Sequence, residues 1–465
     1  MIFDLVIRGG SLASSRGLDR ADIAVKDGVI RAVARPGEDL AAKSEIDATG
    51  KYVLPGLVDA HVHIPGHQLS GRLDNFETAT QAAALGGVTT IMLMPTDDPR
   101  TATPAYFARK RRIGEEQSFV DFAIQAMASP QSERADIEEM ADQGAVSFEL
   151  FLAYGGNPEF IIGNDDFELH RLLQLIGNAG RVAGVTPHSG SLIAKLTQRQ
   201  KEHEANRKYR DPRHEEIVPP AVQIFAVTRP ALSEALGIAR ACTVAAATGT
   251  RVHFRALSAQ GSVDMVRRFR DSAALSSEVM SHHLLFTEEE AFRFGPYGII
   301  VPPIRSRAER DSLRLAVQTG QIDMVVSDHS PVLREDKERG WANIWQTLPG
   351  MPGLQTLLAS MLALADDGII GLPDIARICA ERPATCFGLA PRKGALVEGA
   401  DADLVVVDPT RPMLVEDRRQ RSRANYTTLK GRKISSRIER VFLRGELIAH
   451  EGEIVGNPGG RFVRP

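Results

Sequence analysis

The chain has 465 residues, of which 43% are hydrophobic and 25% charged, and its formal net charge at pH 7 is -3. This composition is typical of folded globular proteins and excludes a chain that is disordered throughout. The small negative charge gives no electrostatic reason to expect nucleic acid or an anionic membrane as a partner, so we expect a small-molecule substrate. No apolar run is long enough to span a bilayer, and Asp4 and Arg8 interrupt any apolar core of a signal peptide, which predicts a cytoplasmic protein.

The two ends of the chain read as β-structure. Short apolar runs at 5–10 and 23–33 are separated by glycine turns, and similar runs return at 403–408 and 440–449. We therefore predict that residues 1–53 and 396–465 form one small β-sandwich domain.

The middle of the chain, residues 54–395, alternates between apolar strand candidates and longer helical stretches. Repeated β-α units of this number predict a (β/α)8 TIM barrel, in which catalytic side chains lie at the carboxyl ends of the strands. The eight strand candidates are the segment ending at His61, followed by 89–94, 123–127, 146–151, 182–185, 251–254, 276–279 and 324–327.

Potential metal ligands follow several of these strands. His61 and His63 are two positions apart, and alternate side chains of a strand point to the same face, so both imidazoles can bind one ion. His188 and Asp328 also stand at predicted strand ends. Because the carboxyl ends of the barrel strands meet at one rim, these four side chains predict the metal site of a metal-dependent hydrolase.

Six segments stand in an order that is characteristic of one protein family. They are PGLVDAHVHI at 55–64, FETATQAAALGGVTTIMLMP at 76–95, SEVMSHHLLFTEEE at 277–290, PPIRSRAERDSL at 302–313, VVSDHSP at 325–331 and KGALVEGADADLVVVDP at 393–409. In these segments the chain resembles the amidohydrolase superfamily, in the cyclic amidohydrolase branch that contains hydantoinase, dihydropyrimidinase, allantoinase and dihydroorotase.

The resemblance implies a binuclear metal centre from which this chain departs at two positions. Where relatives have a carboxylated lysine on strand 4, this chain has Glu149, and where they have a histidine on strand 6 it has Ala256. Glu149 retains the negative charge with a shorter reach, whereas alanine cannot bind a metal. His253 and Arg255 stand at odd separations from Ala256, so in a regular strand they face the other side of the sheet.

The remaining ligand set favours one metal, most simply zinc, over two. His61, His63, His188 and Asp328 provide three imidazoles and a carboxylate, with Glu149 as a further ligand or a hydrogen-bond partner of the water. By the resemblance, Asp328 transfers protons, and Tyr154 either stabilises the oxyanion or is a core tyrosine. The alternative is a catalytically silent scaffold or regulatory partner that has lost part of its metal site.

The resemblance also bounds the substrate and the assembly. It implies hydrolysis of a carbon-nitrogen bond in a cyclic amide, imide or ureide. The segments 76–80 and 327–331 together with Trp341 favour an allantoinase, whereas 151–154 favours a dihydropyrimidinase or hydantoinase, so the two cues conflict. Members of this branch commonly assemble, which implies a homo-oligomer, a dimer or tetramer.

Overall fold

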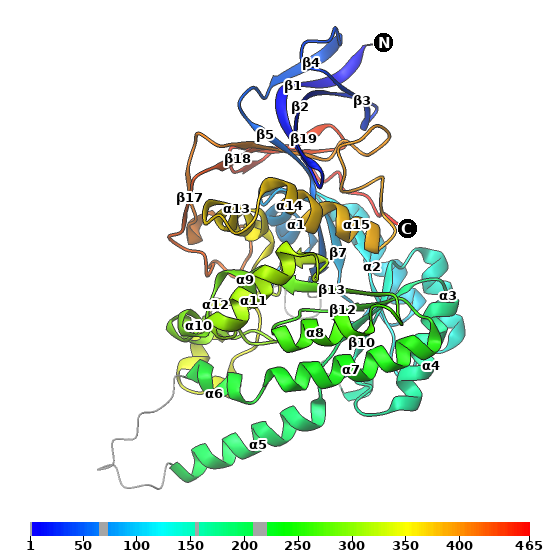
Figure 1. Cartoon of the computed structure of the whole chain (residues 1–465), viewed down its shortest axis with the longest axis vertical. Helices are drawn as coiled ribbons and strands as arrows, with labels where there is room; N and C mark the ends of the chain where they lie inside the picture. Colours follow the sequence, from blue (N-terminus) through cyan, green and yellow to red (C-terminus); the bar gives the residue numbers. More distant parts are fainter. Residues whose placement is uncertain (1, 65–72, 154–157, 208–220) are drawn as a thin grey trace.

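The computed structural model describes residues 2–64, 73–153, 158–207 and 221–465. Helices surround a barrel of parallel strands, and a separate sheet built from both chain ends lies against one side of it (Figure 1). The predicted TIM barrel with a β-sandwich made from both ends of the chain is confirmed.

The barrel strands are short, parallel and almost completely buried, as expected when helices cover a parallel sheet. Gln125 interrupts the third strand, so that one part pairs with the second strand and the other part with the fourth. A parallel bridge from Val62 to His329 joins the first strand to the end of the last. The strands are β6 (Leu57–Val62), β7 (Val88–Leu93), β8 (Asp121–Ile124) with β9 (Ala126–Met127), β10 (Ser147–Phe151), β11 (Val182–Thr186), β12 (Val252–Phe254), β13 (Leu275–Met280) and β14 (Met324–Val326).

Local sequence signals set the ends of several surrounding helices. The side chain of Asn75 accepts a hydrogen bond from the Thr78 amide at 2.9 Å and begins α1, and Gly144, with φ of 109°, ends α3. The helices are α1 (Phe76–Leu85), α2 (Pro104–Gln117), α3 (Arg134–Gln143), α4 (Asp166–Asn178), α5 (Gly190–Arg207), α6 (Ala221–Val227), α7 (Ala231–Thr248), α8 (Gln260–Phe269), α9 (Ser281–Leu285), α10 (Glu288–Phe294), α11 (Arg307–Gln318), α12 (Arg334–Glu338), α13 (Leu357–Asp366), α14 (Leu372–Ala376) and α15 (Arg382–Cys386). Among the described helices, none is both long and apolar enough to cross a membrane.

The sheet of the chain ends has nine strands in one hydrogen-bonded network. Its N-terminal and C-terminal parts meet at β5, which pairs parallel with β1 and antiparallel with β15. The strands are β1 (Phe3–Ser14), β2 (Gly17–Lys26), β3 (Val29–Ala34), β4 (Ala42–Asp47), β5 (Tyr52–Pro55), β15 (Leu404–Asp408), β18 (Arg437–Leu443), β19 (Glu446–His450) and β20 (Glu453–Ile454), with β16 (Met413–Leu414) and β17 (Lys433–Ile434) forming a separate pair.

Buried apolar side chains from both chain ends share one core in this sheet, including Ile23, Val53 and Val406. The boundaries at residues 53/54 and 395/396 stay a prediction. A buried ion-pair cluster fixes the barrel to the sheet: Lys393, which is completely buried, lies 2.8 Å from Asp403 and also binds Asp121 of β8.

Candidate metal site

The His-x-His pair lies at the carboxyl end of β6 with its imidazoles facing one point. His61 Nε2 and His63 Nε2 are 3.2 Å apart. Asp328 Oδ1 is 3.2 Å from the first nitrogen and 3.0 Å from the second. Metal-bound nitrogen and oxygen at about 2.0–2.1 Å in a tetrahedral shell lie roughly 3.3 Å from one another, so the three atoms fit around one ion.

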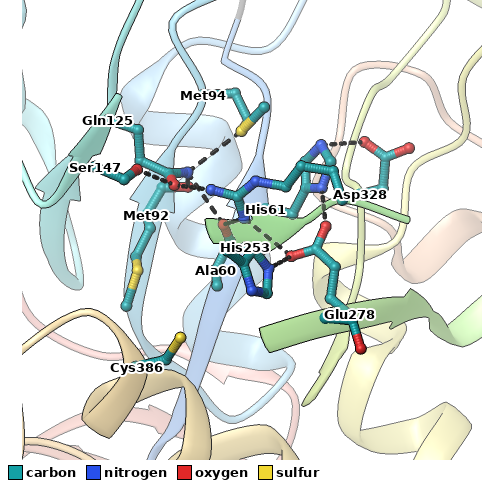
Figure 2. A network of polar contacts seen from close by, with 12 residues as sticks. Ala60, His61, Met92, Met94, Gln125, Ser147, His253, Glu278, Asp328 and Cys386 are labelled. Atoms are coloured by element: carbon teal, nitrogen blue, oxygen red, sulfur yellow. Dashed lines mark hydrogen bonds and ion pairs between the residues drawn. The ribbon is translucent and has the colours of Figure 1, made fainter. Parts of the chain in front are cut away.

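Hydrogen bonds on the other ring nitrogens orient the two histidines. His61 Nδ1 contacts Glu278 Oε1, and His63 Nδ1 shares a hydrogen bond of 2.5 Å with Thr96 Oγ1. Figure 2 shows Glu278 between His61 and His253, with Asp328 on the far side of His61. The ionised Glu278 carboxylate can only accept a hydrogen bond, so it favours the Nδ1-H tautomer of His61 and leaves its Nε2 lone pair for a metal, the arrangement found in many metal sites. The Thr96 hydroxyl orients the ring of His63.

Asp328 is presented by an unusual backbone conformation just beyond β14. Its φ of 44° lies in the left-handed region that non-glycine residues seldom adopt, which is common at functional sites. Although burial favours the neutral acid, the neighbouring His61 and His63 keep the pKa of Asp328 below its usual value, so the carboxylate is ionised at neutral pH.

The two imidazoles differ in their electrostatic surroundings. Burial disfavours protonation of His61, but the carboxylates of Glu278 and Asp328 outweigh it and raise the pKa of His61. For His63, burial dominates and lowers the pKa. Burial, with Arg305 and Arg229 nearby, lowers the pKa of His188 to about 3, so that imidazole is neutral at physiological pH and has a lone pair for a metal or a substrate proton.

The site opens into a cavity of about 300 Å³, a volume suited to a compact ligand. Polar groups of several strand ends face it together with apolar loop residues. The lining residues are His61, His63, Met94, Thr96, Arg100, Phe151, Thr186, His188, Arg255, Ala256, Val301, Pro302, Asp328, Ser330 and Pro349.

The structure brings together three of the five predicted ligands. Among the described residues, the ligand atoms of His61, His63 and Asp328 lie within 4.8 Å of one another, and this group does not include Glu149 or His188. His188 lines the same cavity and is buried. Tyr154 lies outside the described residues. The metal and catalytic roles of all these side chains stay predictions.

Glu149 is held by a completely buried arginine. Its Oε1 accepts a hydrogen bond from Arg255 Nη2 at 2.6 Å and its Oε2 accepts one from Arg255 Nε at 3.0 Å, while Ser147 donates to Oε1 at 2.8 Å. Arg255 Nη1 donates to Glu278 Oε2 at 2.9 Å and to the Ala60 carbonyl at 3.1 Å. Burial disfavours the charged guanidinium, but the two carboxylates raise the pKa of Arg255.

The expectation that His253 and Arg255 face away from the barrel interior was wrong. His253 Nε2 lies 3.0 Å from Glu278 Oε2, so it shares this carboxylate with Arg255 and His61. Ala256, the reference position for the alternation, has a φ of 52° and breaks the extended backbone two residues beyond the end of β12. Alternation of side chains applies only where the chain is extended, so the parity of Ala256 does not carry back into the strand.

Sequence reasoning missed Glu278, Arg255, Thr96 and Arg100 as parts of this site. Glu278 lies in β13, where a charged residue among buried neighbours signals an interior partner. Arg255 gives the same signal directly after β12. Thr96 and Arg100 belong to the loop after β7, and no residue spacing singles them out.

Two imidazoles, each contacted at its other ring nitrogen, and a carboxylate lie together at the rim of a (β/α)8 barrel, an arrangement typical of metal-dependent hydrolases. Comparison with known proteins gives the family. Residues 52–448 match the model of the amidohydrolase family, and the chain belongs to this family. Members of the family typically use divalent metals, and the described residues include a group able to hold one.

The similarity to individual proteins extends over whole chains. The sequence is 32% identical to an L-hydantoinase of Paenarthrobacter aurescens, covering 99% of this chain and 98% of that protein. It is 33% identical to an allantoinase of Rubrobacter xylanophilus, covering 100% of this chain and 98% of that protein. The solved L-hydantoinase (dihydropyrimidinase) from Arthrobacter aurescens superimposes with a TM-score of 0.93 at 31% identity, covering 100% of both chains.

Proposed function

We propose that this protein hydrolyses a carbon-nitrogen bond of a cyclic amide, imide or ureide, using water activated by one divalent metal ion, most simply zinc. The observation that carries the proposal is the convergence of His61, His63 and Asp328 within 4.8 Å at the floor of the cavity. The relatives named as hydantoinases and allantoinases support the substrate class.

The charges in the barrel interior support a single metal. The buried carboxylates of Glu149 and Glu278 share hydrogen bonds with the Arg255 guanidinium, and both oxygens of Glu149 are engaged by it. A second metal bound through Glu149 would have to displace this buried cation. We infer that Arg255 supplies, as a fixed part of the chain, positive charge that a second ion would otherwise provide.

The roles of the side chains follow from their positions. We assign the metal to His61, His63 and Asp328, with His188 as a further ligand or a substrate contact. A bound divalent ion supplies Lewis acidity toward the attacking water and the amide carbonyl. Asp328, ionised at neutral pH, accepts a proton from that water and returns it to the leaving ring nitrogen. The backbone that holds Asp328 at a positive φ fixes this carboxylate in position.

Two further assignments rest on different grounds. By the resemblance to the family, Tyr154 is assigned to the oxyanion of the tetrahedral intermediate. From its hydrogen bonds with Arg255, Glu149 is assigned to charge balance in place of direct metal binding. We expect a cytoplasmic homo-oligomer, a dimer or tetramer. The alternative, a silent scaffold, is disfavoured because three metal ligands have been kept in one orientation around an open cavity.

Metal content per chain tests the proposal. We expect about one zinc or similar ion per wild-type chain by elemental analysis, lost in His61→Ala and kept in His170→Ala, a matched control at an exposed position. The metal-loaded wild type should then open hydantoin, dihydrouracil or allantoin. A chain that takes up no metal even after supplementation would support the silent scaffold, and two ions per chain would contradict the charge argument at Arg255.

A further inference from the structure

The side chain of Arg100 faces the cavity without a hydrogen-bond partner among the described residues. It belongs to the loop between β7 and α2 and lines the same cavity as His61, His63 and Asp328. Its Nη1 is buried, yet it donates to no atom of the described residues. A buried guanidinium nitrogen without an acceptor is costly, which marks a place where another molecule supplies the acceptor.

Two backbone hydrogen bonds anchor the loop at Arg100 and at the next residue. The backbone carbonyl of Arg100 accepts a hydrogen bond from the Ala102 amide at 2.8 Å, and the Thr101 carbonyl accepts one from the Met127 amide at 2.8 Å. The guanidinium carbon lies 5.3 Å from the centre of the Phe160 ring. Such a stacked arginine is preorganised for recognising a planar anion such as a carboxylate.

Nearby acids do not neutralise this arginine. Asp97 forms an ion pair with Lys110 at 3.1 Å and accepts a hydrogen bond from Thr101 at 3.0 Å, so its charge is already compensated. Asp98 is exposed and makes no ion pair with Arg100 among the described contacts. Burial lowers the pKa of Arg100, opposed by these two aspartates, but a guanidinium stays protonated at physiological pH.

The carboxylates at the metal site have partners other than Arg100. Asp328 contacts His61 and His63, and Glu149 and Glu278 form ion pairs with Arg255. Arg100 therefore makes no ion pair with any described residue, and Asp97 and Asp98 act on its charge only from beyond ion-pair distance. A neutral substrate would leave this charge unpaired, whereas an anionic substituent on the substrate would neutralise it.

We propose that Arg100 binds an anionic substituent, such as a carboxylate, on the ring of the cyclic amide substrate and so selects acid-substituted rings. The inference rests on the proposed function, because it places the scissile bond at the metal site. Met94, Phe151 and Val301 supply apolar walls for the ring, and the 300 Å³ cavity limits the substrate to a compact ring with a short acidic arm.

A matched pair of substrates tests this selection. The compounds are 5-(carboxymethyl)hydantoin and the corresponding carboxamide, which have nearly the same size and differ in charge. We expect wild-type kcat/KM to favour the acid by roughly 10- to 100-fold, the range for a hydrogen bond to a charged group. Arg100→Gln should bring this ratio close to one, and Arg100→Lys should restore part of it because its charge is kept.

Two controls separate substrate binding from a structural role. Arg112→Gln removes an exposed arginine of α2 and should leave the ratio unchanged. Since Arg100 makes no hydrogen bond that the variant would lose, Arg100→Gln should melt at the wild-type temperature or above it. A lower melting temperature, with an equal loss of activity on both compounds, would identify a structural arginine and overturn the inference.

The outcomes also distinguish this inference from the proposed function. Equal wild-type rates on both compounds would refute the role of Arg100 and leave the hydrolase intact. If neither compound is hydrolysed, the inference is tested by calorimetry, which measures the affinity of both compounds for the metal-loaded wild type and for Arg100→Gln. Tighter binding of the acid that is lost in the variant supports an anion site, and equal binding refutes it.

Discussion

Replacing Arg255 by methionine tests how the barrel interior balances its charges. In the wild type this side chain and the carboxylates of Glu149 and Glu278 have exposed fractions of 0 to 1%. The substitution leaves two buried carboxylates without the guanidinium. Removing one partner of a buried ion pair costs about 3–5 kcal/mol of unfolding free energy, so we expect Arg255→Met, freed of metal, to be destabilised by about that amount in urea unfolding.

The same variant should acquire a second metal site, because Glu149 is then free to bind a cation. We expect metal content to rise from about one to about two ions per chain. Added zinc should restore about 2.7 kcal/mol of unfolding free energy once free metal reaches roughly 100 times its dissociation constant. Arg267→Met, which removes an exposed arginine paired with Asp264, is the matched control and should change stability by less than about 1 kcal/mol.

A double variant keeps the test informative if Arg255→Met does not fold. Glu149→Gln combined with Arg255→Met removes both charges and should recover much of the lost stability, because Glu278 still contacts His61 and His253. The reasoning is refuted if Arg255→Met keeps wild-type stability without metal, or if it folds normally and still binds a single ion at saturating zinc.

Three further predictions follow from the geometry. Asp328→Asn should lower kcat by at least about 100-fold, the scale of general acid-base catalysis, with unchanged circular dichroism; full turnover would exclude the proton transfer assigned to Asp328. Ala256→His should still bind one metal, because the Arg255 cation remains beside Glu149 and because φ at position 256 is 52°. Two bound ions would show that this cation does not exclude a second metal. Burial lowers the pKa of Lys337 to about 7, whereas the pKa of an unfolded lysine is about 10.4. Between these two pH values the unfolded chain binds more protons than the folded one, so the unfolding free energy of the wild type should rise with pH relative to that of Lys337→Met. Parallel pH profiles of the two proteins in urea unfolding would contradict this.

The sequence by itself determined the barrel, the sheet made from both chain ends and the three side chains that converge. The spacing of His61 and His63 within an apolar strand requires them to share a face, and Asp328 ends another apolar strand. These inferences hold because they depend on the local periodicity of extended chain and on the rule that parallel strand ends meet at one rim.

Only the tertiary structure decided how the charges are arranged around those ligands. Arg255 reaches Glu149 over a separation of 106 residues, and Glu278 reaches His61 over 217. Periodicity placed Arg255 on the wrong side because the backbone turns at Ala256, and it gave no sign that Arg100 faces the cavity. The direction of a side chain beyond a strand end depends on backbone torsions and on distant partners, and neither is encoded in the spacing of residues along the chain.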